Sequence, residues 1–142
     1  IADFSEAEIN ELVHLSKIVM INSHEYQILL ENSQLSEEQL LDMLEQLVVT
    51  RGAKGVDVYE SGSCVHVPAV EGIANIDPTG CGDAFRAGYI YGLMGNYSTK
   101  ICARIGCVIA SINLENRDTQ TYECDEAILR SRYRSAYGDA LN

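Results

Sequence analysis

The segment DPTGCGD at residues 77–83 holds the residue types in this chain that are best suited to chemistry. Gly80 and Gly82 let the backbone turn tightly and approach a ligand closely. A helix is predicted directly after them, so its free N–H groups and the positive end of its dipole face the turn. Such a turn is a ready site for an anion.

Asp83 falls in the first turn of that predicted helix, next to the anion site. A carboxylate there repels an anion, so its position favours a chemical role, and accepting a proton from an attacking hydroxyl is one such role. The alternative is an ordinary glycine turn in which Asp83 only complements the helix dipole. Arg86, three residues later, is predicted either to form a salt bridge or to contact a nucleotide.

Helices and buried strands alternate along the part of the chain that precedes this segment. Ser5 with Glu8, and Ser36 with Gln39, form capping boxes that open two of the helices. Helices are predicted at 5–15, 24–31, 36–47, 84–93, 99–114 and 125–137, and buried strands at 17–21 and 48–50.

A hairpin is predicted from the alternating segments 55–59 and 64–67, with its turn at 60–63. Buried strands separated by helices are typical of the α/β class, with a parallel sheet flanked by helices. Two such strands and a hairpin are few for a complete doubly wound sheet, and match what its second half would contain.

The composition restricts the class of function. The 142 residues carry a net charge of −11, with 46% apolar and 22% charged residues. Nucleic acids and anionic membranes require a positive field, so neither is an expected partner. ATP remains compatible, because backbone N–H groups and Mg²⁺ can meet its charge locally.

Cysteine and histidine residues show no pattern of a disulfide framework or a metal site. The five cysteines are odd in number and form no CxxC pair, so free thiols are expected. The three histidines lack metal-ligand spacing, and His66 is expected to be a surface residue.

The N-terminal residues resemble neither a signal peptide nor a membrane span, so a cytoplasmic location is expected. The chain opens without Met, which suggests a piece of a longer protein.

Three further segments accompany the DPTGCGD turn, in a fixed order. NSHE at 22–25 follows the first predicted strand, TRGAKG at 50–55 follows the second, and NRDTQ at 116–120 lies in the tail. Together with DPTGCGDAFRAG at 77–88, they resemble the motifs of the ribokinase-like (PfkB) family of sugar and nucleoside kinases.

The resemblance implies that residues 1–142 are the C-terminal nucleotide-binding and catalytic part of a single ribokinase-like domain, whose N-terminal half and lid are absent. It implies phosphoryl transfer from ATP to a hydroxyl of a sugar or nucleoside, with Asp83 as general base. The N–H groups of Gly80, Cys81 and Gly82 would form an anion hole. The isolated chain is expected to be inactive, because it lacks the substrate pocket.

The resemblance also implies the positions of the nucleotide and the metal ions. Thr50, Gly52, Gly55 and Asn113 would bind the nucleotide, with Thr50 and Gly52 along the phosphate and ribose path. Asn22 and Glu25 would position Mg²⁺ through waters, and Asp77 and Thr79 would help to hold a monovalent cation, K⁺.

The sequence departs from the family pattern at two positions. Cys81 stands where many relatives have Ala, which leaves the required backbone N–H in place. Asp118 stands where the cation loop often carries Gly, which puts carbonyl ligands from residues 116–120 in doubt.

Two other classes of function are alternatives to the kinase. A dinucleotide-binding fold needs G-x-G-x-x-G after its first strand, and the third glycine is missing here. A non-catalytic half that needs a partner chain remains the alternative. The expected partners are a small sugar or nucleoside and the missing half, as a separate chain or not, and a homodimer is left open.

Overall fold

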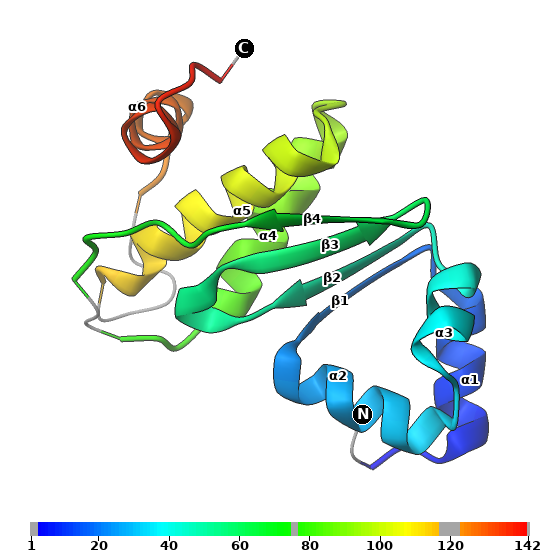
Figure 1. Ribbon diagram of the computed structural model, residues 1–142. Coiled ribbons are helices and arrows are strands. Elements are labelled where there is room, and N and C mark those ends of the chain that lie inside the picture. The colour runs from blue at the N-terminus through cyan, green and yellow to red at the C-terminus, as the bar shows by residue number, and fades with distance from the viewer. Residues whose placement is uncertain (1–2, 75–76, 117–122, 142) are drawn as a thin grey trace. The chain divides into compact units, whose positions relative to one another are not determined.

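The computed structural model describes residues 3–74, 77–116 and 123–141. The chain divides into two compact units, Ile1–His66 and Val67–Asn142, which are described in turn. Figure 1 shows the order of the elements along the chain.

The first unit is built on a four-stranded sheet in the order β1-β2-β3-β4 (Figure 1). β1 and β2 are parallel, whereas β2 and β3 are antiparallel. The α/β class, the parallel pair and the hairpin predicted from the sequence are therefore confirmed. The elements are α1 (Glu6–Leu15), β1 (Ile18–Asn22), α2 (Ser23–Ser33), α3 (Glu37–Met43), β2 (Gln46–Thr50), η1 (Gly52–Lys54), β3 (Val56–Glu60) and β4 (Ser63–Val67).

Apolar residues of the three helices pack with those of β1 and β2 in one core. Both capping boxes form as predicted, at Ser5–Glu8 and Ser36–Gln39. The buried core residues are Ile9, Val13, Ile21, Tyr26, Leu29, Leu40, Leu44, Leu47 and Val49.

The third helix ends earlier than predicted. Leu44 has an extended backbone, with φ −111° and ψ 143°, and β2 already begins at Gln46. Leu47 is therefore a strand residue, paired with Val19, although it is fully buried as expected. The spacing of Leu47 from Leu40 and Leu44 fits a helix period, but backbone pairing with the whole length of β1 makes this segment a strand.

The hairpin turn between β3 and β4 consists of Ser61 and Gly62, both with positive φ. A two-residue turn of this kind matches the right-handed twist of the flanking strands.

The described residues of the second unit form the helices α4 (Cys81–Met94), α5 (Thr99–Leu114) and α6 (Glu126–Tyr137). α5 and α6 match their predictions. α4 begins at Cys81 rather than at Ala84, because Gly80 takes a left-handed conformation (φ 78°) and its carbonyl already accepts the N–H of Ala84 at 2.9 Å. Within the described residues, no helix is long and apolar enough to cross a membrane.

Glycines let α4 and α5 pack backbone against backbone. A Cβ added at Gly88 would come within 2.9 Å of the Gly106 Cα. On its other side α5 packs against α6 through Ile105, Val108, Ile112, Leu129 and Tyr133.

Candidate active site

The glycine turn before α4 has the geometry of an anion site. The first N–H groups of a helix have no intrahelical partners, and at α4 no described side chain caps them. The Cys81 N–H donates to the Pro78 carbonyl at 3.2 Å. Of the three N–H groups expected to form the anion hole, that of Cys81 is therefore already engaged within the turn, and the first helical turn adds the N–H of Asp83.

Asp83 projects into solvent from the first turn of α4, with 85% of its side chain exposed. Its Oδ1 accepts a hydrogen bond from Arg86 Nη1 at 2.8 Å. Of the two alternatives for Arg86, the structure shows the salt bridge. The pair gives the turn a carboxylate and a guanidinium next to each other at the positive end of a helix.

Asp77 and Thr79 form the other end of the turn. Asp77 Oδ1 accepts the Thr79 N–H at 2.9 Å, and the Asp77 N–H donates to the Leu114 carbonyl at 3.4 Å. Hydrogen bonds from Thr79 lower the pKa of Asp77, the larger effect coming from its side chain and the smaller from its backbone N–H. Asp77 is therefore charged at neutral pH, and a carboxylate is one of the oxygen ligands that suit a cation.

Asn113 connects α5 to the same turn, although its side chain is only 2% exposed. Its Nδ2 donates to the Thr79 carbonyl at 2.8 Å and lies 3.4 Å from Cys81 Sγ. Among the described residues, its buried Oδ1 has no hydrogen-bond partner. The second unit thus gathers seven of the predicted site residues around one turn: Asp77, Thr79, Gly80, Cys81, Gly82, Asp83 and Asn113.

The first unit gathers the remaining predicted residues at the carboxyl ends of β1 and β2. Asn22 and Thr50 are register partners at those ends. Asn22 Oδ1 accepts the N–H groups of His24 (2.9 Å) and Glu25 (2.8 Å), and Glu25 Oε2 accepts the Asn22 N–H at 2.8 Å. The two residues predicted to position Mg²⁺ therefore also form the N-terminal capping box of α2.

The TRGAKG segment forms a compact loop that contains η1. Gly52 and Gly55 both have positive φ, at 57° and 94°. The Arg51 N–H donates to the Gly55 carbonyl at 2.8 Å, which closes the loop. Thr50 Oγ1 lies 3.5 Å from the Ile21 carbonyl, so its hydroxyl sits between the two parallel strands.

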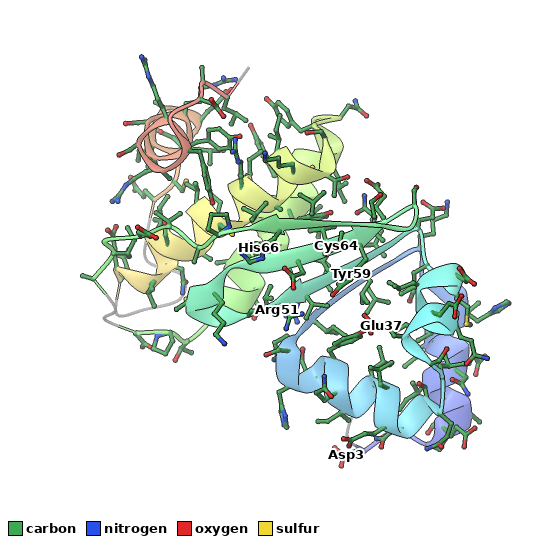
Figure 2. All side chains as sticks on the ribbon, viewed as in Figure 1. Asp3, Glu37, Arg51, Tyr59, Cys64 and His66 are labelled. Atoms are coloured by element: carbon green, nitrogen blue, oxygen red, sulfur yellow. The ribbon has the colours of Figure 1, made fainter. Side chains whose placement is uncertain are left out.

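A charged cluster on the hairpin was not predicted. Asp57, 14% exposed in its side chain, accepts from Arg51 Nε and lies 2.6 Å from His66 Nδ1. Burial raises the pKa of Asp57, but hydrogen bonds from His66 and Arg51 outweigh it and hold that pKa below its usual value. His66 is half exposed, as expected, and Figure 2 shows Arg51, Cys64 and His66 over the sheet. Only the alternation of the two strands could have indicated that Asp57 and His66 share a face.

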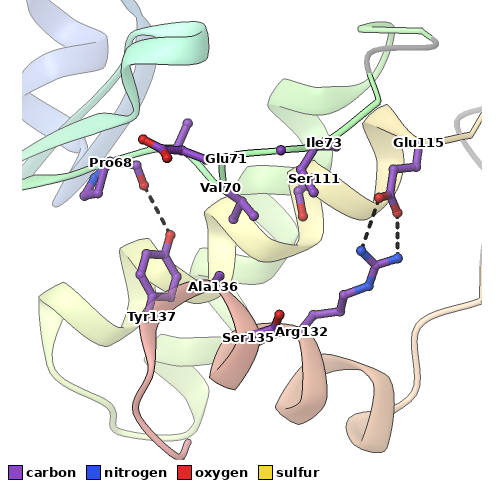
Figure 3. Close-up of a pocket in the computed structure, with 12 residues that line it drawn as sticks. Pro68, Val70, Glu71, Ile73, Ser111, Glu115, Arg132, Ser135, Ala136 and Tyr137 are labelled. Carbon is purple, nitrogen blue, oxygen red and sulfur yellow. Dashed lines mark hydrogen bonds and ion pairs between the residues drawn. The ribbon is translucent and has the colours of Figure 1, made fainter.

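A pocket of about 640 Å³ lies in the second unit between the 68–73 segment, α5 and α6 (Figure 3). Arg132 donates to Glu115 through both terminal nitrogens, at 3.1 and 2.6 Å, along one wall. Tyr137 donates its hydroxyl to the Pro68 carbonyl at 3.2 Å.

The described residues contain no group of three or more His, Cys, Asp or Glu side chains that could hold a metal ion by themselves. In the tail, Asn116 Nδ2 donates to the Ile112 carbonyl at 2.7 Å. The rest of the predicted cation loop, 117–120, lies outside the described residues.

The sequence profile of the pfkB family of carbohydrate kinases matches residues 1–126. The nucleoside kinase of Methanocaldococcus jannaschii is 28% identical over 118 residues, which are 83% of this chain and 39% of that protein. The chain thus spans less than half the length of this curated relative.

Solved structures of a nucleoside kinase also superpose on this chain. The nucleoside kinase of Burkholderia thailandensis in complex with inosine is 27% identical and superposes with a TM-score of 0.93, over 97% of this chain and 46% of that one. Another structure of that kinase, in complex with ADP-inosine, also gives a TM-score of 0.93 and 27% identity, over 96% of this chain and 43% of that one.

Proposed function

The chain belongs to the pfkB family of carbohydrate kinases, and from that membership we propose that the protein transfers a phosphoryl group from ATP to a hydroxyl of a nucleoside or a sugar. The resemblance noted in the sequence and the ribokinase-like fold are confirmed. The observation that carries the proposal is the exposed carboxylate of Asp83 at the open N-terminus of α4. A nucleoside is favoured as acceptor because the similar proteins above are nucleoside kinases.

Asp83 is proposed as the general base. Its carboxylate takes the proton of the acceptor hydroxyl while the hydroxyl oxygen attacks the terminal phosphorus, and ADP leaves as the bond to that phosphorus breaks. The N–H groups of Gly80 and Gly82 are proposed to stabilise the charge that develops on the phosphoryl oxygens, and that of Cys81 joins them when it leaves the Pro78 carbonyl. The exposure of Asp83 supports this role, because a base must be reachable by its substrate.

Asn22 and Glu25 are proposed to position Mg²⁺. Their oxygens suit a hard cation, and they lie at the carboxyl end of β1, the end of a parallel sheet where ligands bind. Asn22 Oδ1 and Glu25 Oε2 already accept backbone N–H groups, so contact through water fits these residues best. Mg²⁺ supplies positive charge that offsets the charge of the phosphates.

Asp77 and Thr79 are proposed to help to hold K⁺ beside the turn. The lowered pKa of Asp77 keeps its carboxylate charged, which supports a cation there.

Thr50, Gly52 and Gly55 are proposed to lie along the phosphate and ribose path. The positive φ of both glycines supports close approach of a ligand to this loop.

The 640 Å³ pocket is proposed to receive the adenine base. Its volume lies in the usual range for small-molecule sites. Val70, Ile73 and the Tyr137 ring provide apolar lining for a flat base. α5 supports this proposal, because it contributes Ser111 and Glu115 to the pocket and Asn113 to the anion turn.

The two units together are proposed to be the nucleotide-binding and catalytic part of one ribokinase-like domain, whose acceptor site lies on further residues. The alternative is a non-catalytic half that needs a partner chain. The coverage of 39% of the M. jannaschii enzyme supports both.

The proposal is tested with the purified full-length protein, Mg·ATP and a panel of inosine, adenosine, ribose and fructose, by following ADP release. We expect Asp83→Asn to lower kcat by about 10²–10⁴-fold, the usual effect of removing a general base. The KM for ATP should change little, because binding does not need the proton acceptor.

Glu126→Gln is the matched control. Glu126 is likewise an exposed carboxylate in a first helical turn, paired with Arg130 at 2.7 Å, but it lies on α6. Its replacement should leave kcat unchanged. A near-normal kcat for Asp83→Asn contradicts the mechanism, and turnover that appears only after a companion polypeptide is added supports the alternative.

A further inference from the structure

Asn113 on α5 supports the anion turn through a side-chain hydrogen bond. The amide lies near the C-terminal end of α5, and its Nδ2 donates to the Thr79 carbonyl at 2.8 Å, joining residues 34 positions apart. The same nitrogen lies 3.4 Å from Cys81 Sγ, which in turn lies 3.7 Å from the Ala110 carbonyl. One side chain therefore contacts the turn on both sides of Gly80.

The amide is not explained by stability alone. Its Oδ1 is buried with no hydrogen-bond partner among the described residues, and an unpaired buried acceptor destabilises the folded state. The single hydrogen bond to Thr79 stabilises the folded state by a similar amount, so the two effects roughly cancel. A leucine of similar size would fill the same space without the unpaired oxygen.

The bond to Thr79 fixes the direction of the N–H groups that follow. Thr79 is held at both ends of its backbone, because its N–H donates to Asp77 Oδ1 and its carbonyl accepts from Asn113. The next residue, Gly80, has a left-handed φ of 78° that directs the chain into α4. A carbonyl released at Thr79 would let this peptide rotate and redirect the first N–H groups of the helix.

We infer that Asn113 is a positioning residue for phosphoryl transfer, which acts by fixing the Thr79 carbonyl and so aiming the anion hole. The inference rests on the proposed function and makes its anion site more specific. It also refines the predicted nucleotide-binding role of Asn113: the side chain, at 2% exposure, works through the turn and does not touch the nucleotide.

The test is Asn113→Leu in the full-length protein. Because misplacement by about 1 Å costs up to about 100-fold in rate, kcat should fall by about 10- to 100-fold. The KM for ATP should change by less than about threefold, since the N–H groups act mainly on charge that develops during transfer. The melting temperature should stay the same or rise, because the unpaired Oδ1 is removed as well.

Asn10→Leu is the matched control. Asn10 also has a buried Oδ1 with no partner in the part of the chain that the structure describes, but it lies on α1 in the first unit. The same substitution there should leave kcat unchanged. Asn113→Gln keeps an amide donor and should recover part of the lost kcat.

Hydrogen exchange gives a readout that does not need activity. The amides of residues 79–83 should exchange faster in Asn113→Leu than in the wild type or in Asn10→Leu. Unchanged exchange there overturns the inference, as does a normal kcat in Asn113→Leu together with an inactive Asp83→Asn. If the wild type phosphorylates no acceptor, the proposed function fails, and the exchange rates still decide the role of Asn113.

Discussion

Gly88 lies where α4 and α5 touch backbone to backbone, and its replacement by Ala tests that contact. A Cβ at this position would meet the Gly106 Cα at 2.9 Å, the Ile105 carbonyl oxygen at 3.0 Å and the Ile109 Cγ1 at 3.0 Å. Two of these three atoms are backbone and cannot move without the whole helix. The substitution should therefore push the two helices apart.

The size of the effect follows from two opposing contributions. Overpacking of a tight contact costs about 1–3 kcal/mol, and the upper value applies because the obstacle is backbone. Alanine gains about 1 kcal/mol over glycine inside a helix. The free energy of unfolding should therefore fall by about 2 kcal/mol in Gly88→Ala.

The assay is urea-induced unfolding followed by far-ultraviolet circular dichroism, since the chain has no Trp. Gly82→Ala is the control for stability: it lies in the same helix, and its Cβ would meet only Arg86 Nη1, at 3.9 Å. Gly82→Ala should equal or exceed the wild type in stability. A Gly88→Ala protein as stable as Gly82→Ala would refute the close packing of α4 on α5.

Two further predictions concern side chains outside this contact. Brief alkylation should label Cys81 before the other cysteines and ATP should slow it, because Cys81 lies in the anion turn at the start of α4, whereas burial raises the pKa of Cys64, Cys107 and Cys124. Peptide mapping that finds Cys64 or Cys124 modified and Cys81 intact would contradict it. Asp57→Asn should lower the free energy of unfolding at pH 7 by about 2 kcal/mol. Because the pKa of Asp57 is lowered in the folded state, its carboxylate stabilises the fold above the unfolded pKa of about 4, and this stabilisation is lost as the pH falls through the folded pKa. The free energies of unfolding of the two proteins should therefore converge at about pH 2–3. A difference that stays constant with pH would show that the charge of Asp57 does not stabilise the fold.

Much of the local structure follows from the sequence, because its signals act over a few residues. Ser5 and Ser36 each bond to the backbone three residues later, which fixes two helix starts whatever the rest of the chain does. The glycines at 80 and 82 likewise make the anion turn predictable, since few residues tolerate the backbone at Gly80. The family resemblance rests on such short motifs, and the profile match confirms it.

Where local sequence signals conflict, tertiary contacts determine the secondary structure. Leu44 and Leu47 continue a helical period, yet the pairing of Leu47 with Val19 turns that segment into a strand. Pairing with β1 satisfies backbone groups along the full strand, which outweighs the preference of a few residues for a helix.

The contacts between distant residues were also beyond the reach of the sequence. Asn113 meets Thr79 only because α5 packs against α4 through Gly88 and Gly106. Asp57 meets His66 only because the turn at Ser61 and Gly62 sets the register of the hairpin. The sequence therefore determined which residues could do chemistry, whereas packing determined which of them hold one another in place, because a hydrogen bond requires its two atoms within about 3 Å of each other.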